Sequence, residues 1–197
     1  VVHKNGGVFI ADEVQPGFAR TGQAFFGFAR HGIVPDMITM GKPMGNGIPI
    51  SGLAAKEDVL AAFSDKLPYF NTFGGNPVSI AAAQAVLKYI KDENLQEHCK
   101  KAGAALLKAL KEVQERHPES VGDVRGAGLF LGFEFVKNDG NKTPDKDMAL
   151  NVIEMLRDEH ILTSVIGHYG NILKLRPPMV FSENDIDWFA TSLDKCI

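Results

Sequence analysis

The 197-residue chain has few of the features that mark specialised protein classes. Its only two cysteines, Cys99 and Cys196, lie far apart and form no CxxC pair, which excludes a disulfide framework and a cysteine zinc site. We therefore expect a reducing compartment, the cytoplasm. No stretch approaches the roughly 18 apolar residues of a membrane span. The start, VVHKNGGVFIADEV, lacks the basic region and the continuous apolar region of a signal peptide.

An excess of positive charge is also missing. The chain has 21 Lys and Arg against 24 Asp and Glu, a net charge of −3, which excludes a nucleic-acid binder that works by bulk charge. The six histidines show no HExxH or similar spacing, so we expect no metal site. Apolar residues make up 45% and charged residues 23%, which is typical of a globular protein of one or two domains.

Strand-like and helix-like segments alternate along the chain, and this pattern predicts α/β layers. Strands are expected at 8–14, 36–41, 50–55, 128–136, 161–165 and 171–175. Helices are expected from residue 57, at 79–91 with Ser79 as N-cap, at 95–116, at 145–159 and at 182–195 with Ser182 at its start. The polar stretch near 92–96 is the best boundary, giving domains 1–95 and 96–197.

Two of the expected strands end in residues that can carry chemistry. Asp12 and Glu13 close the first strand, where ligands of open α/β sheets bind. The alternative is that these acids cap a local structure or are simply solvated. Lys42 follows the second strand. Packed between Met40 and Met44 it would be partly desolvated, and desolvation supplies the neutral amine that a Schiff base needs. A surface lysine before a turn is the alternative.

Two further segments suit anions. TFGGNP at 72–77 is a glycine-rich turn before a helix, whose backbone amides and Thr72 hydroxyl could cradle a phosphate. Lys174 and Arg176 are two residues apart in a strand and so share a face, which suits a carboxylate or phosphate unless they only protect a sheet edge. RGAGLFLG at 125–132 opens a strand instead of a helix, which excludes a dinucleotide-binding glycine motif.

Taken together, FIADEVQPGFARTG, PDMITMGKPMGNGIPISG and NTFGGNP resemble the class III (ω-type) aminotransferases, over essentially the whole chain. These are pyridoxal-phosphate enzymes of fold type I, the aspartate aminotransferase-like fold. The resemblance implies that residues 1–95 are the second half of the large three-layer, cofactor-binding domain. It implies that residues 96–197 are the small C-terminal α/β domain.

The resemblance also assigns roles to five residues. Asp12 would pair with the pyridine nitrogen of the cofactor, Val14 would pack on its ring, and Gln15 would lie near its phenolic oxygen. Lys42 would be the Schiff-base lysine that also moves the substrate proton. Thr72 would reach the cofactor phosphate of the neighbouring subunit, which implies a homodimer with shared active sites.

One departure concerns the substrate. Many family members have an arginine three residues before the first proline of the strand-end motif, to hold the substrate carboxylate. This position is Lys174 here, and Arg176 lies two residues further on. The stretch YGNILKLRPPMVFS looks more like the phospholyase branch, and a second cation suits an extra anionic group.

Three readings therefore stay open. The first is amino-group transfer from an amino acid or amine to a 2-oxo acid, and the second is a phospholyase acting on a phosphorylated amine. The third is a non-catalytic fragment or binding module with this fold. The resemblance places the phosphate-binding helix start and the stacking aromatic upstream of Val1, so we expect the chain alone to bind pyridoxal phosphate weakly or not at all.

Overall fold

The computed structural model describes the backbone of residues 1–197 and every side chain except that of Ala62. The chain divides into two compact units, Val1–Gln96 and Glu97–Ile197. Within the described residues, no helix has both the length and the apolar character that a membrane span requires.

The first unit is built around a three-stranded sheet in the order β1-β2-β3. Its strands and α-helices are β1 (Ile10–Asp12), β2 (Met37–Met40), β3 (Gly52–Ala55), α1 (Glu57–Ser64) and α2 (Pro77–Asp92). Short 3₁₀ helices lie at His3–Asn5, Gly27–His31 and Lys42–Gly45. The three expected strands and the expected helices are confirmed, with each strand shorter than its apolar run.

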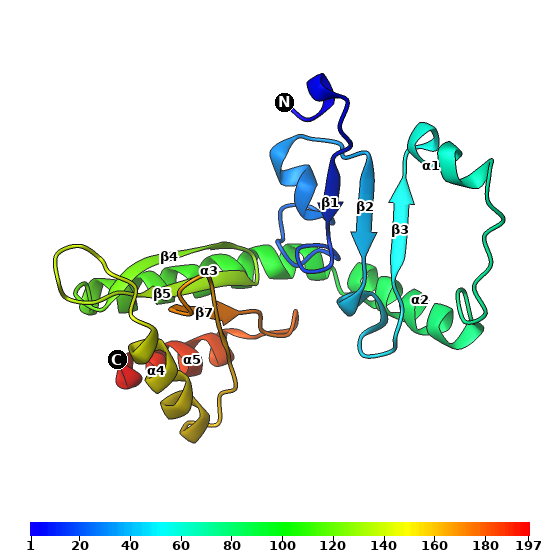
Figure 1. Ribbon diagram of the computed structural model, residues 1–197. Coiled ribbons are helices and arrows are strands. Elements are labelled where there is room, and N and C mark those ends of the chain that lie inside the picture. The colour runs from blue at the N-terminus through cyan, green and yellow to red at the C-terminus, as the bar shows by residue number, and fades with distance from the viewer. The chain divides into compact units, whose positions relative to one another are not determined.

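The strand directions decide where the chemistry of this unit gathers. β1 and β2 are parallel and place Asp12 opposite Thr39, whereas β3 runs antiparallel to β2. In Figure 1 the arrows of β1 and β2 point the same way, and that of β3 points the other way. The carboxyl ends of β1 and β2 therefore lie at one edge of the sheet, where open α/β sheets bind their ligands.

The expected N-cap of α2 is wrong by three residues. The cap is Asn76, whose Oδ1 accepts a hydrogen bond from the backbone N–H of Ser79 at 2.9 Å. Pro77 occupies the first helical position, where its fixed φ suits a helix and its missing N–H costs nothing. The hydroxyl of Ser79 instead donates to the carbonyl of Pro49 at 3.0 Å.

At the amino ends of β1 and β2, the buried carboxylate of Asp36 joins three segments. It accepts hydrogen bonds from the backbone N–H of Phe9 and from Lys56 Nζ, both at 2.8 Å, and lies 2.7 Å from His3 Nε2. The hydrogen bond from Lys56, together with the others, holds the pKa of Asp36 well below its ordinary value of 3.8. The ionised carboxylate therefore stabilises the folded chain.

Asp36→Asn should lower the unfolding temperature of the protein at neutral pH. Because the folded-state pKa is depressed, the stabilisation is complete above the ordinary pKa of 3.8 and is lost as the pH falls through the folded-state value. The difference between variant and wild type should therefore shrink on acidification below pH 3.8. Thermal unfolding at several pH values, with the exposed Asp65→Asn as control, measures this. A difference that stays constant into acid would contradict it.

The second unit is a sheet of four strands in the order β4-β5-β7-β6, packed with helices. Its elements are α3 (Leu95–Arg116, which begins at the end of the first unit), β4 (Val121–Ala127), β5 (Phe130–Phe135), α4 (Lys146–Asp158), β6 (Val165–Ile166), β7 (Ile172–Leu175) and α5 (Glu183–Cys196). The predicted start of α5 is confirmed, because Ser182 and Asp185 form a reciprocal capping box.

One strand of this unit is not predicted by the sequence, and the extent of another is predicted wrongly. β4 was not expected, because Gly122, Asp123 and Arg125 obscure the alternation of apolar and polar residues that marks a strand. It nevertheless pairs with β5 along its length, as an edge strand of the sheet. The glycine-rich segment 125–132 contains the end of β4, the turn at 128–129 and the start of β5, so it opens a strand and not a helix, as expected. The strand expected at 161–165 is also wrong in extent, because pairing begins only at Val165.

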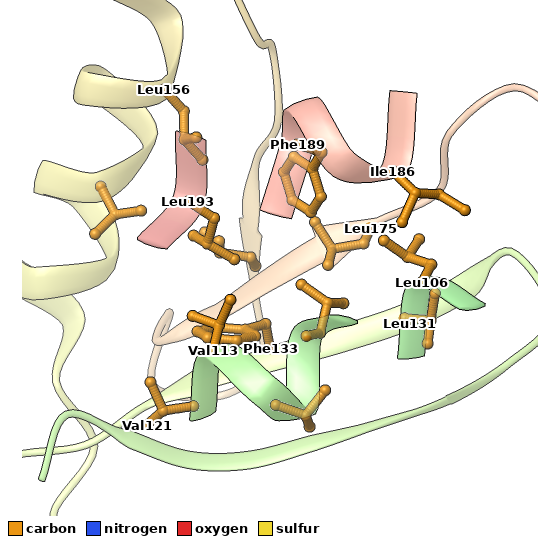
Figure 2. Close-up of a cluster of buried hydrophobic side chains, with 14 of the residues drawn as sticks. Leu106, Val113, Val121, Leu131, Phe133, Leu156, Leu175, Ile186, Phe189 and Leu193 are labelled. Carbon is orange, nitrogen blue, oxygen red and sulfur yellow. The ribbon is translucent and has the colours of Figure 1, made fainter. Parts of the chain in front are cut away.

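The core of the second unit lies between the sheet and its helices. Figure 2 shows side chains from α3, the sheet, α4 and α5 meeting in one cluster. Phe133 and Phe135 on β5 are fully buried, with ring centroids 5.3 Å apart. The labelled members are Leu106, Val113, Val121, Leu131, Phe133, Leu156, Leu175, Ile186, Phe189 and Leu193. This core fixes β7, which carries the predicted cation Lys174 and ends one residue before Arg176.

Candidate functional site

The edge where β1 and β2 end carries the first group of candidate residues. Asp12 is the last residue of β1, and Lys42 follows β2 by two residues. The backbone N–H of Glu13 donates to the carbonyl of Thr39 at 2.9 Å, so the two strand ends stay joined past the last paired residues. The sequence thus delivers a carboxylate and an amine to one edge of the same sheet.

Asp12 is exposed and held by its neighbours. Its Oδ1 accepts hydrogen bonds from the backbone N–H of Val14 at 3.1 Å and from the hydroxyl of Thr39 at 3.3 Å. These contacts orient the carboxylate while leaving it open to solvent. Asp12 can therefore present a negative charge to a ligand at the sheet edge.

Glu13 has the opposite environment. It is only 2% exposed, and its two oxygens accept hydrogen bonds from the backbone N–H groups of Gly27 and Phe28, at 2.7 and 2.8 Å. The sequence suggested capping and ligand binding as alternatives for this acidic pair. In the structure Glu13 does the capping, and Asp12 is left available.

Val14 and Gln15 lie in the turn that follows β1. The N–H of Gly17 donates to the carbonyl of Glu13 at 3.1 Å and closes this turn, and both Val14 and Gln15 are half-buried. Among the residues that the structure describes, Oε1 of Gln15 is buried and accepts no hydrogen bond. A buried amide oxygen without a partner costs free energy. Because protein atoms cover this oxygen, the side chain has to turn before the oxygen can meet a ligand.

Lys42 adopts a strained backbone at the start of the 3₁₀ helix. Its φ is +40°, a left-handed value that costs a residue with a Cβ atom about 1–3 kcal/mol. Strain of this kind is concentrated at functional sites. Lys142 and His160 also have positive φ values, so the backbone conformation of Lys42 agrees with a functional role but does not by itself assign one.

The expected burial of Lys42 between Met40 and Met44 is wrong. Lys42 is exposed, because the two methionines lie elsewhere. Their terminal methyl carbons come within 3.3 and 3.6 Å of the position that a Cβ on Gly52 would occupy, beside β3. The described chain therefore supplies the lysine but not an apolar cover over its amine.

The glycine-rich loop before α2 differs from its prediction. Thr72 is exposed, as a residue that reaches a ligand must be. However, the N–H groups of Phe73 and Gly74 are not free for a phosphate. They donate to Oδ1 of Asn71, at 3.2 and 3.0 Å, in a turn that the side chain of Asn71 closes.

In the second unit, Lys174 on β7 and Arg176, one residue past the end of β7, line one pocket of about 510 Å³. The expectation that both cations lie in the strand is wrong for Arg176. The guanidinium carbon of Arg176 lies 5.8 Å from the centroid of the Phe130 ring. Burial lowers the pKa of the Arg176 guanidinium from its ordinary value. The pocket is otherwise largely apolar and includes Phe181 and Trp188. It fits a ligand with an anionic group and an apolar part.

Comparisons with known proteins identify the family of the chain. The profile of the family described as "Aminotransferase class-III" matches residues 1–197. The chain is 44% identical to ethanolamine-phosphate phospho-lyase homolog 1 of Caenorhabditis elegans, covering 100% of this chain and 42% of that protein. It is 42% identical to the mitochondrial alanine–glyoxylate aminotransferase 2 homolog 2 of Arabidopsis thaliana, covering 98% and 40%.

Solved structures give the same result for the fold. A phospholyase from Arthrobacter in complex with phosphoethanolamine matches with a TM-score of 0.94 and 39% identity, over 98% of this chain and 46% of that one. A transaminase from the marine bacterium Virgibacillus matches with a TM-score of 0.91 and 31% identity, over 99% and 46%. The chain thus spans less than half the length of the relatives it matches.

Proposed function

The chain belongs to the class III aminotransferases, and from this premise we propose that the full-length protein transfers an amino group from an amino acid or amine to a 2-oxo acid. Family membership implies pyridoxal phosphate as the cofactor and the fold of its transaminase and phospholyase relatives. The observation that carries the proposal is the edge of the first sheet. There, two parallel strands place an open carboxylate, Asp12, and a strained lysine, Lys42, at their carboxyl ends.

The residues at this edge fit pyridoxal phosphate. Lys42 would hold the cofactor through its amine, and the charge of Asp12 would keep the pyridine nitrogen protonated. Gln15 would lie near the phenolic oxygen, and Val14 would cover the ring. When bound, the cofactor supplies a ring that accepts electrons from the substrate.

Lys42 would also act on the substrate. When its amine is not engaged in holding the cofactor, Nζ of Lys42 would take the proton from the substrate Cα and carry it during the reaction. A base that is released beside the reacting atom acts at high effective concentration. One residue thus serves as tether and as proton carrier.

The homodimer is part of the proposal, with Thr72 reaching the cofactor phosphate of the neighbouring subunit. Support comes from the side chains around Thr72. Tyr69, Phe70 and Phe73 are 73%, 85% and 82% exposed, and large apolar groups of this kind mark interaction surfaces. The cytoplasm stays a prediction, since the Arabidopsis relative is named as mitochondrial.

A second candidate function is a phospholyase acting on a phosphorylated amine. It is favoured by the two cations in one pocket, Lys174 and Arg176, since a phosphate carries more charge than a carboxylate. In this reaction Lys42 would remove the Cα proton, and the C–O bond to the phosphate on the next carbon would break. Hydrolysis with water would then release an aldehyde or ketone, ammonia and inorganic phosphate.

An assay of the full-length protein loaded with pyridoxal phosphate separates these reactions. Amino transfer consumes a 2-oxo acid and forms a new amino acid. Phospholyase activity releases phosphate and ammonia from a phosphorylated amine such as phosphoethanolamine, with no 2-oxo acid present. If the protein binds the cofactor but forms neither product from any donor, the non-catalytic reading remains.

Lys174→Ala and Arg176→Ala should each raise KM for the anionic donor about 10- to 100-fold, because hydrogen bonds to charged groups contribute about 1.5–3 kcal/mol. The value of kcat should change less, since neither residue acts at Cα. Lys108→Ala is the matched control, because this lysine is 81% exposed and pairs with Glu112 on α3. Steady-state kinetics measure the effect. An unchanged KM in both variants would contradict a substrate role for this pocket.

A further inference from the structure

Glu13 is a buried carboxylate that the proposed chemistry does not use. Its Oε2 accepts from the N–H of Gly27 and its Oε1 from the N–H of Phe28. Hydrogen bonds to an ionised acceptor are roughly twice as strong as neutral ones. Glu13 therefore ties the end of β1 to residues 14 and 15 positions later in the chain.

The loop between these contacts has little freedom. A Cβ on Gly17 would lie 2.6 Å from the carbonyl oxygen of Glu13, and a Cβ on Gly27 would lie 2.7 Å from Cβ of Pro16. Both positions therefore require glycine. Phe18 and Ala19 are buried with φ values of +57° and +67°, which persist only where surrounding contacts hold them.

The clamped loop begins with the residues that face the proposed cofactor. Val14 and Gln15 lie between Glu13 and Gly17, whose carbonyl and N–H close the turn at 3.1 Å. The ring of Pro16, next to Gln15, packs against Gly27, one of the two residues that bind the Glu13 carboxylate. A movement of Gly27 would therefore displace Pro16 and, with it, the turn that contains Gln15.

We propose that Glu13 is a positioning residue for cofactor binding: its buried carboxylate fixes the 14–28 loop so that Val14 and Gln15 are presented at the carboxyl edge of β1 and β2. The proposal rests on the proposed function, because it assumes that the cofactor binds at this edge. It assigns Glu13 no contact with the cofactor. Its effect passes through the turn.

The chain offers a matched comparison in Asp36. This carboxylate is also buried, and it also accepts a backbone N–H, that of Phe9, but at the opposite end of β1. If Glu13 only stabilised the fold, Glu13→Gln and Asp36→Asn should have the same kind of effect. If Glu13 positions the turn, only Glu13→Gln should change cofactor binding.

The experiment uses the full-length protein and titrates pyridoxal phosphate into wild type, Glu13→Gln and Asp36→Asn, with circular dichroism to verify folding. The glutamine amide has one acceptor and turns an NH₂ group toward one of the two N–H donors. We expect Glu13→Gln to weaken cofactor binding about tenfold or more and to shift the absorption band of the bound cofactor. Asp36→Asn should lower the unfolding temperature but leave the affinity within about twofold of wild type.

Two further measurements make the test specific. Without cofactor, hydrogen exchange at the Gly27 and Phe28 amides should speed up in Glu13→Gln. In a Gln15→Ala background, Glu13→Gln should add little to the loss of affinity, since coupled residues are not additive. Should Glu13→Gln fail to fold, Gly27→Ala, which pushes on Pro16, should weaken binding in the same way.

The outcomes separate the proposals. The positioning role would be overturned if Glu13→Gln folds and binds the cofactor as tightly as Asp36→Asn does. Where Glu13→Gln does not fold, the same result with Gly27→Ala would overturn it. Full additivity with Gln15→Ala would overturn it too. A wild-type protein that takes up no cofactor at Lys42 would instead remove the proposed function, and the positioning role would fall with it.

Discussion

Lys42→Ala should abolish turnover of the full-length protein. The variant loses both the amine that holds the cofactor and the base that moves the Cα proton. Loss of general acid–base catalysis alone costs about 10²- to 10⁴-fold in rate, and loss of the tether adds to it. The measurement is kcat with the best donor found, for transaminase and phospholyase assays alike.

Two variants control this result. Lys42→Arg keeps the positive charge, but a guanidinium does not deprotonate near neutral pH and cannot form the covalent link, so it should be as inactive as alanine. Lys66→Ala removes an exposed lysine of the same unit and should retain activity. Activity of Lys42→Ala close to wild type would exclude both proposed reactions.

Asp12→Asn should lower kcat at least about a hundredfold, which corresponds to about 2.7 kcal/mol in transition-state stabilisation. The amide keeps the acceptor oxygen that binds the Val14 N–H and the Thr39 hydroxyl, so the turn should stay in place. What is lost is the negative charge that would keep the pyridine nitrogen protonated. Folding should be unaffected, since Asp12 is exposed.

The contribution of the negative charge of Asp12 can be tested separately from that of its side-chain shape. Asp12→Glu retains the charge and should lose less activity than Asp12→Asn, whereas the exposed Asp58→Asn on α1 should lose none. Kinetics and the absorption spectrum of the bound cofactor report the two effects separately. Equal activity of Asp12→Asn and wild type would show that the carboxylate has no part in catalysis.

The position of the site could be predicted because strand ends are readable in the sequence. Short apolar runs that end in Asp12 and Lys42 mark β1 and β2, and a parallel pair brings such ends together. The difference in burial between Asp12 and Glu13 could also have been predicted from the sequence. Ala11 and Glu13 are buried and Asp12 is exposed, as the two-residue alternation of a strand requires.

Other features depend on contacts that a linear pattern does not contain. The loop amides near Thr72 looked free, but the nearby side chain of Asn71 accepts from two of them. Met40 and Met44 flank Lys42 in sequence, yet both side chains turn toward Gly52 of β3. β4 has a weak strand pattern and is defined by its pairing with β5.

Covalent binding of pyridoxal phosphate by Lys42 can be measured by trapping the bond chemically. The full-length protein is incubated with pyridoxal phosphate, reduced with borohydride, digested and analysed by mass spectrometry. We expect a pyridoxyl adduct on the peptide that contains Lys42, and none on the corresponding peptide of Lys42→Ala. A folded wild-type protein without the adduct on that peptide would rule out the proposed role of Lys42 and favour a non-catalytic member of the family.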